Sequence, residues 1–137
     1  MAATNKRALI DAAAKARQSA VAPYSKFKVG AALLTKRGDI ITGINVESAS
    51  YGLTCCAERV ALFNALTSGK QNFIAVAVVA RAPGGPMPCG ACRQLLAEFS
   101  PDLIIVGATL RGDRKVGRLS QLLPDPKRGI LNNVHTA

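Results

Sequence analysis

Apolar positions recur along the chain at two spacings, one typical of helices and one of strands. Apolar residues about 3.6 positions apart predict helices over 5–21, 56–66, 89–99 and 119–123. Thr4 is expected to cap the first helix and Pro23 to end it. Alternating or continuous apolar runs, bounded by Gly, Pro and polar residues, predict strands over 27–34, 39–44, 73–80 and 103–108.

The order of these elements predicts an α/β protein. The turn at 36–39 joins the first two strands as an antiparallel hairpin. Strands and helices alternate in the second half, which favours a largely parallel sheet there. We therefore expect a three-layer α/β/α arrangement, a mixed sheet of about five strands with helices on both faces. No internal repeat or long linker is present, so we expect residues 1–137 to form one domain, with a basic and flexible tail over about 125–137.

Composition narrows the classes of function. Of the 137 residues, 49% are hydrophobic and 19% are charged, as in a folded domain that needs no disulfide scaffold. The longest apolar runs, such as 74–80, are far shorter than the roughly 20 residues that span a membrane. The first 20 residues lack the continuous apolar segment of a signal peptide. We therefore expect a cytoplasmic protein with no membrane partner.

The formal net charge of +10 raises the question of a nucleic-acid partner. The basic residues are spread over the whole chain, however, and the aromatic residues that would stack on bases make up only 4%. Both observations favour a solvated basic surface and argue against nucleic-acid binding. A nonenzymatic RNA-binding protein is the competing hypothesis, which an oligonucleotide titration at low salt would test.

The four cysteines form two tight groups, Cys55 with Cys56 and Cys89 with Cys92. In a reducing cytosol, cysteines clustered in this way are more often metal-binding or catalytic than disulfide-bonded. Cys56 and Cys89 each stand where a loop turns into a predicted helix, and Cys92 shares a helical face with Cys89. A helix N-terminus stabilises thiolates, so three sulfurs could meet at one metal ion. Cys55 would point about 100° away around its helix, as an ordinary thiol.

Three sulfurs leave one position open on a tetrahedral zinc ion. A structural zinc site normally has four protein ligands, and the one histidine of the chain, His135, stands in the tail, where we expect it to be exposed. Three ligands with an open position are typical of catalytic zinc, which holds and acidifies a water. Glu58, two residues after Cys56, is placed to carry that water's protons. A redox C-x-x-C pair, the alternative, would leave Glu58 and Cys56 unexplained.

Longer segments add a family resemblance to this interpretation. Cys-Ala-Glu-Arg at 56–59 and Pro-Cys-Gly-Ala-Cys-Arg-Gln at 88–94 resemble the small, tetrameric cytidine deaminases, as do the segments 23–32 and 43–47. The resemblance implies one zinc ion per subunit and a homotetramer with its active sites at subunit interfaces. It also implies hydrolytic deamination of cytidine and deoxycytidine to uridine and deoxyuridine plus ammonia, in pyrimidine salvage.

The resemblance implies roles for individual residues as well. Phe27 would pack against the pyrimidine ring. Asn45 and Glu47 would hydrogen-bond the ribose, chiefly its 3′-hydroxyl, and the main-chain N–H of Ala57 would hold the pyrimidine O2. A site of this kind would discriminate against free cytosine, because buried polar groups left unpaired are costly.

The resemblance also implies residues that contact a neighbouring subunit, and one that contacts the metal ligands. Ala49 and Tyr51 would reach the active site of a neighbouring subunit. Arg59 would donate to the sulfurs and withdraw part of the net negative charge of zinc with three thiolates. The roles of Arg93 and Gln94 stay open.

The chain departs from the family pattern near its end. Family members carry a phenylalanine after Leu-Leu-Pro that closes a neighbour's site, whereas residues 125–137 contain no phenylalanine, tyrosine or tryptophan. A more open pocket would admit cytosines substituted at C5 or N4. The alternative function is therefore deamination of a modified cytosine nucleoside, or of a blasticidin-type antibiotic, on the same fold. The intact Asn-Val-Glu segment at 45–47 favours ribose recognition and argues against the antibiotic.

Overall fold

The computed structural model describes residues 1–126. Expectations for the tail beyond them, including the exposure of His135, lie outside the described residues. The elements are, in chain order, α1 (Ala3–Arg17), β1 (Gly30–Thr35), β2 (Ile40–Ile44), a single 3₁₀ turn η1 (Tyr51–Leu53), α2 (Ala57–Thr67), β3 (Phe73–Val79), α3 (Gly90–Phe99), β4 (Ile104–Ala108), β5 (Arg114–Arg118) and α4 (Leu119–Leu122). Every helix and strand that the hydrophobic pattern predicts is present, although several ends are shifted.

The strands of the described chain form one mixed sheet in the order β2-β1-β3-β4-β5. β1 pairs antiparallel with both β2 and β3, β3 pairs parallel with β4, and β4 pairs antiparallel with β5. The predicted hairpin and the predicted mixed sheet of five strands are confirmed, but the second half is less parallel than expected, since β4 and β5 pair antiparallel. Because β1 lies between β2 and β3, a strand–helix–strand unit produces a directly paired parallel neighbour only at β3-α3-β4.

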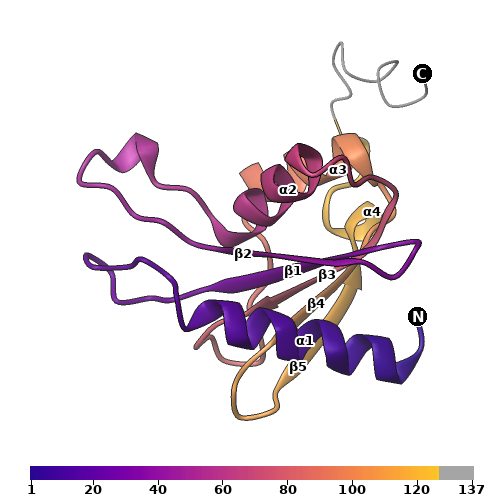
Figure 1. The fold of residues 1–137 in the computed structure, drawn as a ribbon, viewed down its shortest axis with the longest axis horizontal. Helices are drawn as coiled ribbons and strands as arrows, with labels where there is room; N and C mark the ends of the chain where they lie inside the picture. Colours follow the sequence, from indigo (N-terminus) through magenta and orange to yellow (C-terminus); the bar gives the residue numbers. More distant parts are fainter. Residues whose placement is uncertain (127–137) are drawn as a thin grey trace.

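Helices cover both faces of the sheet, as predicted (Figure 1). α1 lies on one face, where Leu9 shares a core with Ala32 and Leu34 of β1. α2, α3 and α4 lie on the opposite face, over a core that includes Ala31 and Leu33. Successive residues of a strand point to opposite faces, so β1 is buried on both. None of the helices in the described part of the chain is long and apolar enough to cross a membrane.

The ends of the first helix differ from the prediction. Thr4 lies inside α1 and does not cap it. α1 ends at Arg17, well before the expected proline, and the next main-chain N–H groups bond three residues back. Val21 is extended and forms a bridge with Val46. This pairing between residues far apart in the sequence replaces the last predicted turn of the helix, and no local pattern predicts it.

Two strand predictions also need correction. β1 begins at Gly30, because the main chains of Phe27 and Val29 bond to the side chain of Asn45. The hydrophobic pattern does not locate β5, since its five residues, Arg-Lys-Val-Gly-Arg, include three basic ones. β5 is an edge strand, and charged side chains are common there because one side of the strand faces solvent.

α2 lies close over β2 because residue 43 is glycine. A Cβ atom at Gly43 would stand 2.3 Å from the main-chain nitrogen of Ala61 and 2.5 Å from the carbonyl oxygen of Ala57. This close approach matters for the candidate site, since α2 carries Cys56 and Glu58 at its start.

We expect Gly43→Ala to lower the free energy of unfolding by about 1–3 kcal/mol, the usual cost of overpacking, because the methyl group would push α2 away from the sheet. Urea denaturation followed by circular dichroism measures the change. Gly117→Ala is the matched control, since the nearest atom to a Cβ atom at Gly117 would be a side-chain carbon of Leu122 at 3.8 Å, an ordinary contact distance. Equal stability of the two variants would contradict the close contact between α2 and β2.

Candidate metal centre and substrate site

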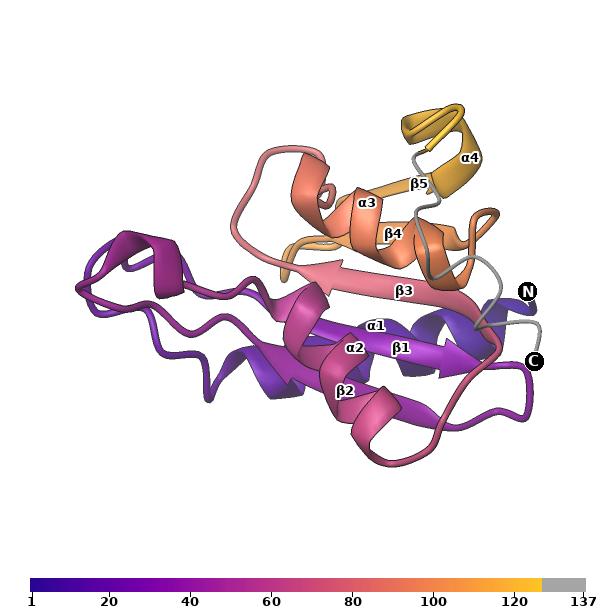
Figure 2. The same cartoon turned by 90° about the horizontal axis from the view of Figure 1, so that it is seen from above.

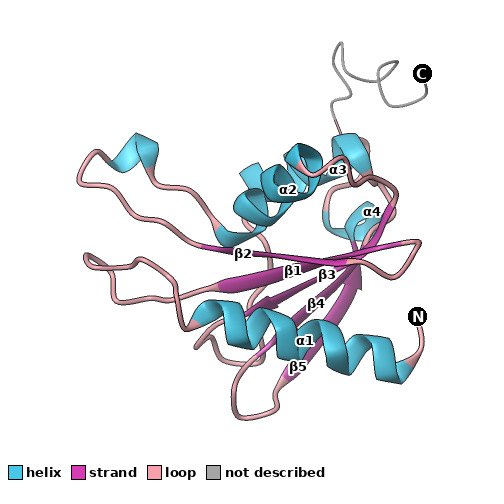
Figure 3. Ribbon diagram, in the orientation of Figure 1, coloured by secondary structure: helices cyan, strands magenta, loops and turns pink. Residues whose placement is uncertain are grey.

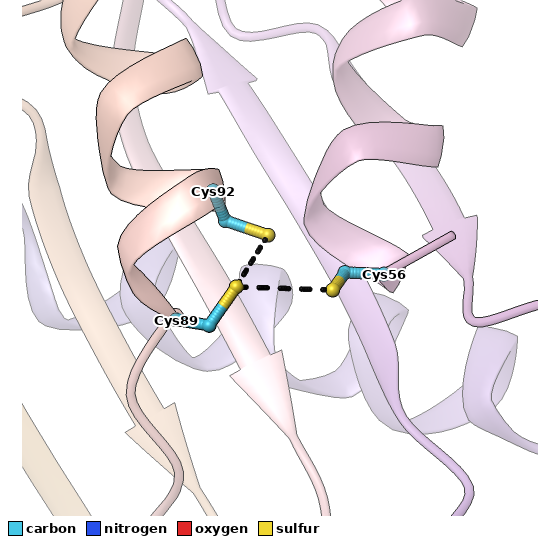
Figure 4. A group of neighbouring side chains, drawn as sticks. All are labelled: Cys56, Cys89 and Cys92. Carbon is cyan, nitrogen blue, oxygen red and sulfur yellow. Dashed lines mark hydrogen bonds between the residues drawn. The ribbon is translucent and has the colours of Figure 1, made fainter. Parts of the chain in front are cut away.

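The sulfur atoms of Cys56, Cys89 and Cys92 meet between the starts of α2 and α3 (Figure 4). The Sγ atom of Cys89 lies 3.9 Å from that of Cys56 and 3.5 Å from that of Cys92. All three sulfurs lie within 4.8 Å of one another. The fold therefore brings together the three predicted metal ligands, two of which are 33 residues apart in the sequence.

Two helix starts place these sulfurs. Cys56 is the N-cap of α2 and Cys89 is the N-cap of α3, both with extended backbone. Cys92 lies in the first turn of α3 and is fully buried. The two helices lie side by side on the same face of the sheet (Figure 2). Unpaired N–H groups and the positive end of each helix dipole face the sulfurs, which stabilises negative charge on them.

The spacing of the sulfurs fits a zinc ion. Zinc binds cysteine sulfur at about 2.3 Å in tetrahedral geometry, so two coordinating sulfurs lie about 3.8 Å apart. The separations of 3.9 and 3.5 Å lie on either side of that value. The three cysteines could therefore hold zinc and leave its fourth position open to water, which is the arrangement of catalytic sites.

Glu58 lies in the first turn of α2, next to the candidate ligands. Its side chain is only 5% exposed. Burial is the main cause that raises the pKa of the Glu58 carboxyl to about 7, and negative charge on Cys56 acts in the same direction. A carboxyl that titrates near neutral pH can both accept and donate a proton, so the geometry suits the predicted proton carrier.

Arg59 places positive charge against the sulfur of Cys56. Its Nη2 donates to the Sγ of Cys56 over 3.4 Å. A hydrogen bond from Cys92, and then the Arg59 guanidinium, lower the pKa of the Cys56 thiol to about 5 against the opposing effect of burial. Thiolates are the form of cysteine that binds metal. The contact agrees with the role that the sequence predicts for Arg59.

Cys55 lies outside the sulfur cluster although it precedes Cys56. Its main chain pairs with Val46 through two hydrogen bonds, of 2.9 and 3.0 Å. Burial raises the pKa of its thiol, which keeps the thiol protonated. The bridge has a further consequence, since it holds the segment 45–47 against the start of α2.

Asn45 fixes the loop that carries Phe27. Its Oδ1 accepts a hydrogen bond from the N–H of Val29 over 2.9 Å, and its Nδ2 donates to the carbonyl oxygen of Phe27 over 2.8 Å. Asn45 is 8% exposed, whereas Phe27 is 42% exposed. The structure thus brings Phe27 and Asn45 together, with the aromatic ring at the surface and the amide engaged in holding the loop.

Glu47 holds the other part of the same loop. Its carboxylate accepts hydrogen bonds from the N–H groups of Tyr24 and Ser25, at 3.0 and 3.1 Å, and from the Ser25 hydroxyl. The Ser25 hydroxyl is the main cause that lowers the pKa of the Glu47 carboxyl. Ser25 is a partner of Glu47 that no local pattern predicts, because 22 residues separate the two in the sequence.

Ala49 and Tyr51 lie on a second loop, which projects beyond the sheet beside the Phe27 loop (Figure 3). Tyr51 is 91% exposed. Both residues line a hollow of about 320 Å³ together with Tyr24 and Glu47. The contact with a neighbouring subunit that the family resemblance implies for Ala49 and Tyr51 stays a prediction.

The prediction for Ala57 concerns its main-chain N–H. Ala57 is the first residue of α2, directly after the N-cap Cys56. The first N–H groups of a helix have no acceptor within the helix. A donor therefore stands next to a candidate metal ligand, where it could hold a carbonyl oxygen of a substrate.

Comparisons with known proteins point to the same chemistry. The family described as the cytidine and deoxycytidylate deaminase zinc-binding region matches residues 3–108. The chain is 50% identical to a cytidine deaminase of Halalkalibacterium halodurans over 121 residues, which cover 88% of this chain and 92% of that protein. The crystal structure of cytidine deaminase from Burkholderia pseudomallei is also 50% identical, with a TM-score of 0.86, covering 93% of this chain and all of that one. A blasticidin-S deaminase of Bacillus cereus is 29% identical over 108 residues, covering 73% and 76% of the two chains.

The matched residues include the sulfur cluster and Glu58. They also include four of the five strands of the described chain, all but β5, and the whole of α1, α2 and α3. Sequence, fold and site therefore lead to one conclusion: the chain belongs to the family of zinc-dependent cytidine deaminases.

Proposed function

We propose that this protein removes the amino group of cytidine and deoxycytidine by hydrolysis, giving uridine or deoxyuridine and ammonia. The observation that carries the proposal is the meeting of three cysteine sulfurs beside the buried Glu58. The relatives at 50% identity that are named cytidine deaminases support the same activity. Its general role is pyrimidine salvage, which we place in the cytoplasm.

Cys56, Cys89 and Cys92 would hold one zinc ion per subunit. When bound, zinc supplies a Lewis acid that makes water reactive at neutral pH. Arg59, which donates to Cys56, would draw off part of the negative charge of the three thiolates. The water would then stay acidic enough to lose a proton to a nearby base.

Glu58 would carry the protons of the reaction. Its carboxylate takes a proton from the attacking water and passes it to N3 of the pyrimidine, while the water oxygen bonds to C4. Glu58 then moves the second proton of that oxygen to the amino group, which leaves as ammonia as the C4 carbonyl forms. One water is consumed for each ammonia released. A pKa raised to about 7 by burial suits a group that must accept and donate protons in one turnover.

Recognition of the nucleoside would fall to the segment beside the metal centre. Phe27 would stack on the pyrimidine ring, Asn45 and Glu47 would bond the ribose, and the N–H of Ala57 would hold O2. The bridge between Val46 and Cys55 supports this assignment, because it fixes the ribose-binding segment next to the start of α2.

The experiment that tests the function compares cytidine, deoxycytidine and cytosine, followed by the loss of ultraviolet absorbance. We expect turnover of both nucleosides and none of the free base. Turnover of cytosine at a comparable rate would contradict ribose recognition by residues 45–47. No turnover of any of the three by zinc-loaded protein would contradict the proposed function itself.

We infer that the protein works as a homotetramer with active sites completed across subunit interfaces. The supporting observation is an apolar tip on the two projecting loops. Its large side chains are exposed by 63% at Tyr24, 42% at Phe27, 91% at Tyr51 and 73% at Leu53. Clustered apolar exposure of this kind usually marks an interaction surface. Ala49, on the same tip, would then reach the site of a neighbouring subunit.

Leu53→Asp should reduce the assembly below four chains, because a charge at the tip opposes burial in an interface. Light scattering on the purified protein measures the mass. Leu110→Asp is the matched control, since Leu110 is 60% exposed but lies on the turn between β4 and β5. A tetramer that tolerates Leu53→Asp, or a parent protein that is a monomer, would contradict the inferred assembly.

A second candidate function is deamination of a modified cytosine nucleoside or of a blasticidin-type antibiotic. It is favoured by the lack of phenylalanine, tyrosine and tryptophan in residues 125–137. The chain is 29% identical to the blasticidin-S deaminase and 50% identical to a cytidine deaminase, which favours cytidine over the antibiotic as the substrate. Turnover of 5-methylcytidine close to that of cytidine would support an open pocket, and equal loss of rate with all bulky analogues would count against it.

A further inference from the structure

We propose that Arg93 is a positioning residue that fixes the metal ligand Cys89 and, through it, the geometry of the metal centre. This role presupposes the function proposed above, since it concerns the site at which that function takes place. The proposal rests on two hydrogen bonds that Arg93 donates, one to the carbonyl oxygen of Pro88 and one to that of Cys89.

Cys89 needs a restraint that the other two ligands already have. Cys92 is fully buried within α3, and Cys56 receives a hydrogen bond from Arg59. Cys89, in contrast, is exposed and ends the loop 80–89 that joins β3 to α3. A ligand at the end of a loop keeps its direction only if the preceding peptide group is held.

Arg93 holds that peptide group from one turn further along α3. Its main-chain N–H donates to the carbonyl oxygen of Cys89 over 2.9 Å. Its Nε donates to the carbonyl oxygen of Pro88 over 2.8 Å. That oxygen belongs to the peptide unit between Pro88 and Cys89, so the two bonds together restrict rotation on both sides of the Cys89 side chain.

The guanidinium of Arg93 is itself held from the opposite side. Its Nη1 donates to the carbonyl oxygen of Leu122, at the end of α4, over 3.2 Å. α4 is anchored by Leu119, which is fully buried and whose N–H donates to the carbonyl oxygen of Leu103 over 2.8 Å. Arg93 therefore braces the ligand loop against an element that is anchored elsewhere. The planar, fork-shaped guanidinium can reach two carbonyl groups at once, which a lysine ammonium on a flexible stem does less well.

The two helix starts thus carry arginines with complementary tasks. Arg59 stands three residues after Cys56 and donates to its sulfur. Arg93 stands four residues after Cys89 and donates to the carbonyl group before it. The first changes the charge of the centre, and the second sets the direction of a ligand. Loss of a residue that orients a metal ligand typically weakens metal binding by about 10–100-fold.

The test measures the rate of zinc release from the zinc-loaded protein to a chromogenic chelator, without substrate. The variants are Arg93→Gln, Arg93→Lys and the matched control Arg118→Gln. Arg118 also makes a charged contact near α4, with Asp102 over 2.9 Å, but Asp102 lies on the turn between α3 and β4 and not in the ligand loop. We expect Arg93→Gln to release zinc about 10–100-fold faster than the parent, Arg93→Lys to fall between them, and Arg118→Gln to keep the parental rate.

Parental zinc release from Arg93→Gln would overturn the proposal. Equal acceleration in Arg93→Gln and Arg118→Gln would overturn it too, because a general loosening around α4 would then explain both. If Arg93→Gln does not fold, Arg93→Lys decides by the same comparison, since it retains the charge and one donor group. The readout needs no cytidine, so a protein that binds zinc but does not deaminate overturns the proposed function alone. A parent protein that takes up no zinc overturns both.

Discussion

Glu58→Gln is expected to lower the turnover number for cytidine by about 10²–10⁴-fold, the usual contribution of a positioned general acid–base, while zinc stays bound. Glutamine matches the shape of glutamate but cannot take a proton from water and pass it on. Glu58 is 5% exposed, so a base from bulk solvent cannot readily replace it. Rates of uridine formation, together with zinc counted per chain by plasma mass spectrometry, measure both parts of this expectation.

Two comparisons separate proton transfer from structural damage in this variant. Glu98→Gln removes a carboxylate near the C-terminal end of α3, far along the helix from Cys89 and Cys92, and should leave turnover unchanged. Because burial raises the pKa of the Glu58 carboxyl to about 7, its charge opposes folding above that pH. The neutral amide should therefore make the zinc-free protein more stable at alkaline pH. Parental turnover in Glu58→Gln would contradict the role of Glu58 as proton carrier.

Cys89→Ser is expected to weaken zinc binding by more than about 100-fold, the upper range for loss of a merely supporting residue, and to abolish turnover with it. A serine hydroxyl is a far poorer zinc ligand than a thiolate, and two sulfurs would remain. Zinc content after dialysis against a competing chelator measures the loss.

The matched control for this variant is Cys55→Ser. Cys55 precedes a candidate ligand but lies outside the sulfur cluster, with its main chain paired to Val46. Cys55→Ser should keep one zinc ion per chain and most of the turnover. Equal zinc content in Cys55→Ser and Cys89→Ser would contradict the assignment of Cys56, Cys89 and Cys92 as the ligand set.

The metal centre was predictable from the sequence because its geometry is mostly local. Cys89 and Cys92 stand one helical turn apart, so helix periodicity alone places them on one face. Cys56 opens the other helix in the same way that Cys89 opens α3. Periodicity does not predict that the two helix starts lie side by side. That expectation came from the family resemblance.

The loop that carries Phe27 could not be predicted in the same way. Its shape depends on hydrogen bonds with the side chain of Asn45, 16 to 18 residues away, and on the bond that Ser25 donates to Glu47, 22 residues away. Contacts of this length leave no periodic trace in the sequence. The predicted strand therefore began too early, at Phe27, and Ser25 was not recognised as a partner of Glu47.

The sheet shows a similar limit. Alternating strands and helices favoured parallel pairing, yet β1 lies between β2 and β3 and pairs antiparallel with both. Where a hairpin strand pairs within a sheet is determined by tertiary packing, which the local pattern of apolar residues does not show. β5 was not predicted for a different reason. The basic residues of Arg114–Arg118 suit a solvent-facing edge strand and give no alternating apolar pattern.

The central claim is that a three-cysteine zinc centre and Glu58 together replace the amino group of cytidine with an oxygen from water. The most direct measurement incubates zinc-loaded protein with cytidine in water enriched in heavy oxygen and weighs the product by mass spectrometry. We predict uridine with a single heavy oxygen, at C4, and one ammonia for each uridine formed. Cytidine left unchanged by folded, zinc-loaded protein, or uridine without the heavy oxygen, would contradict the claim.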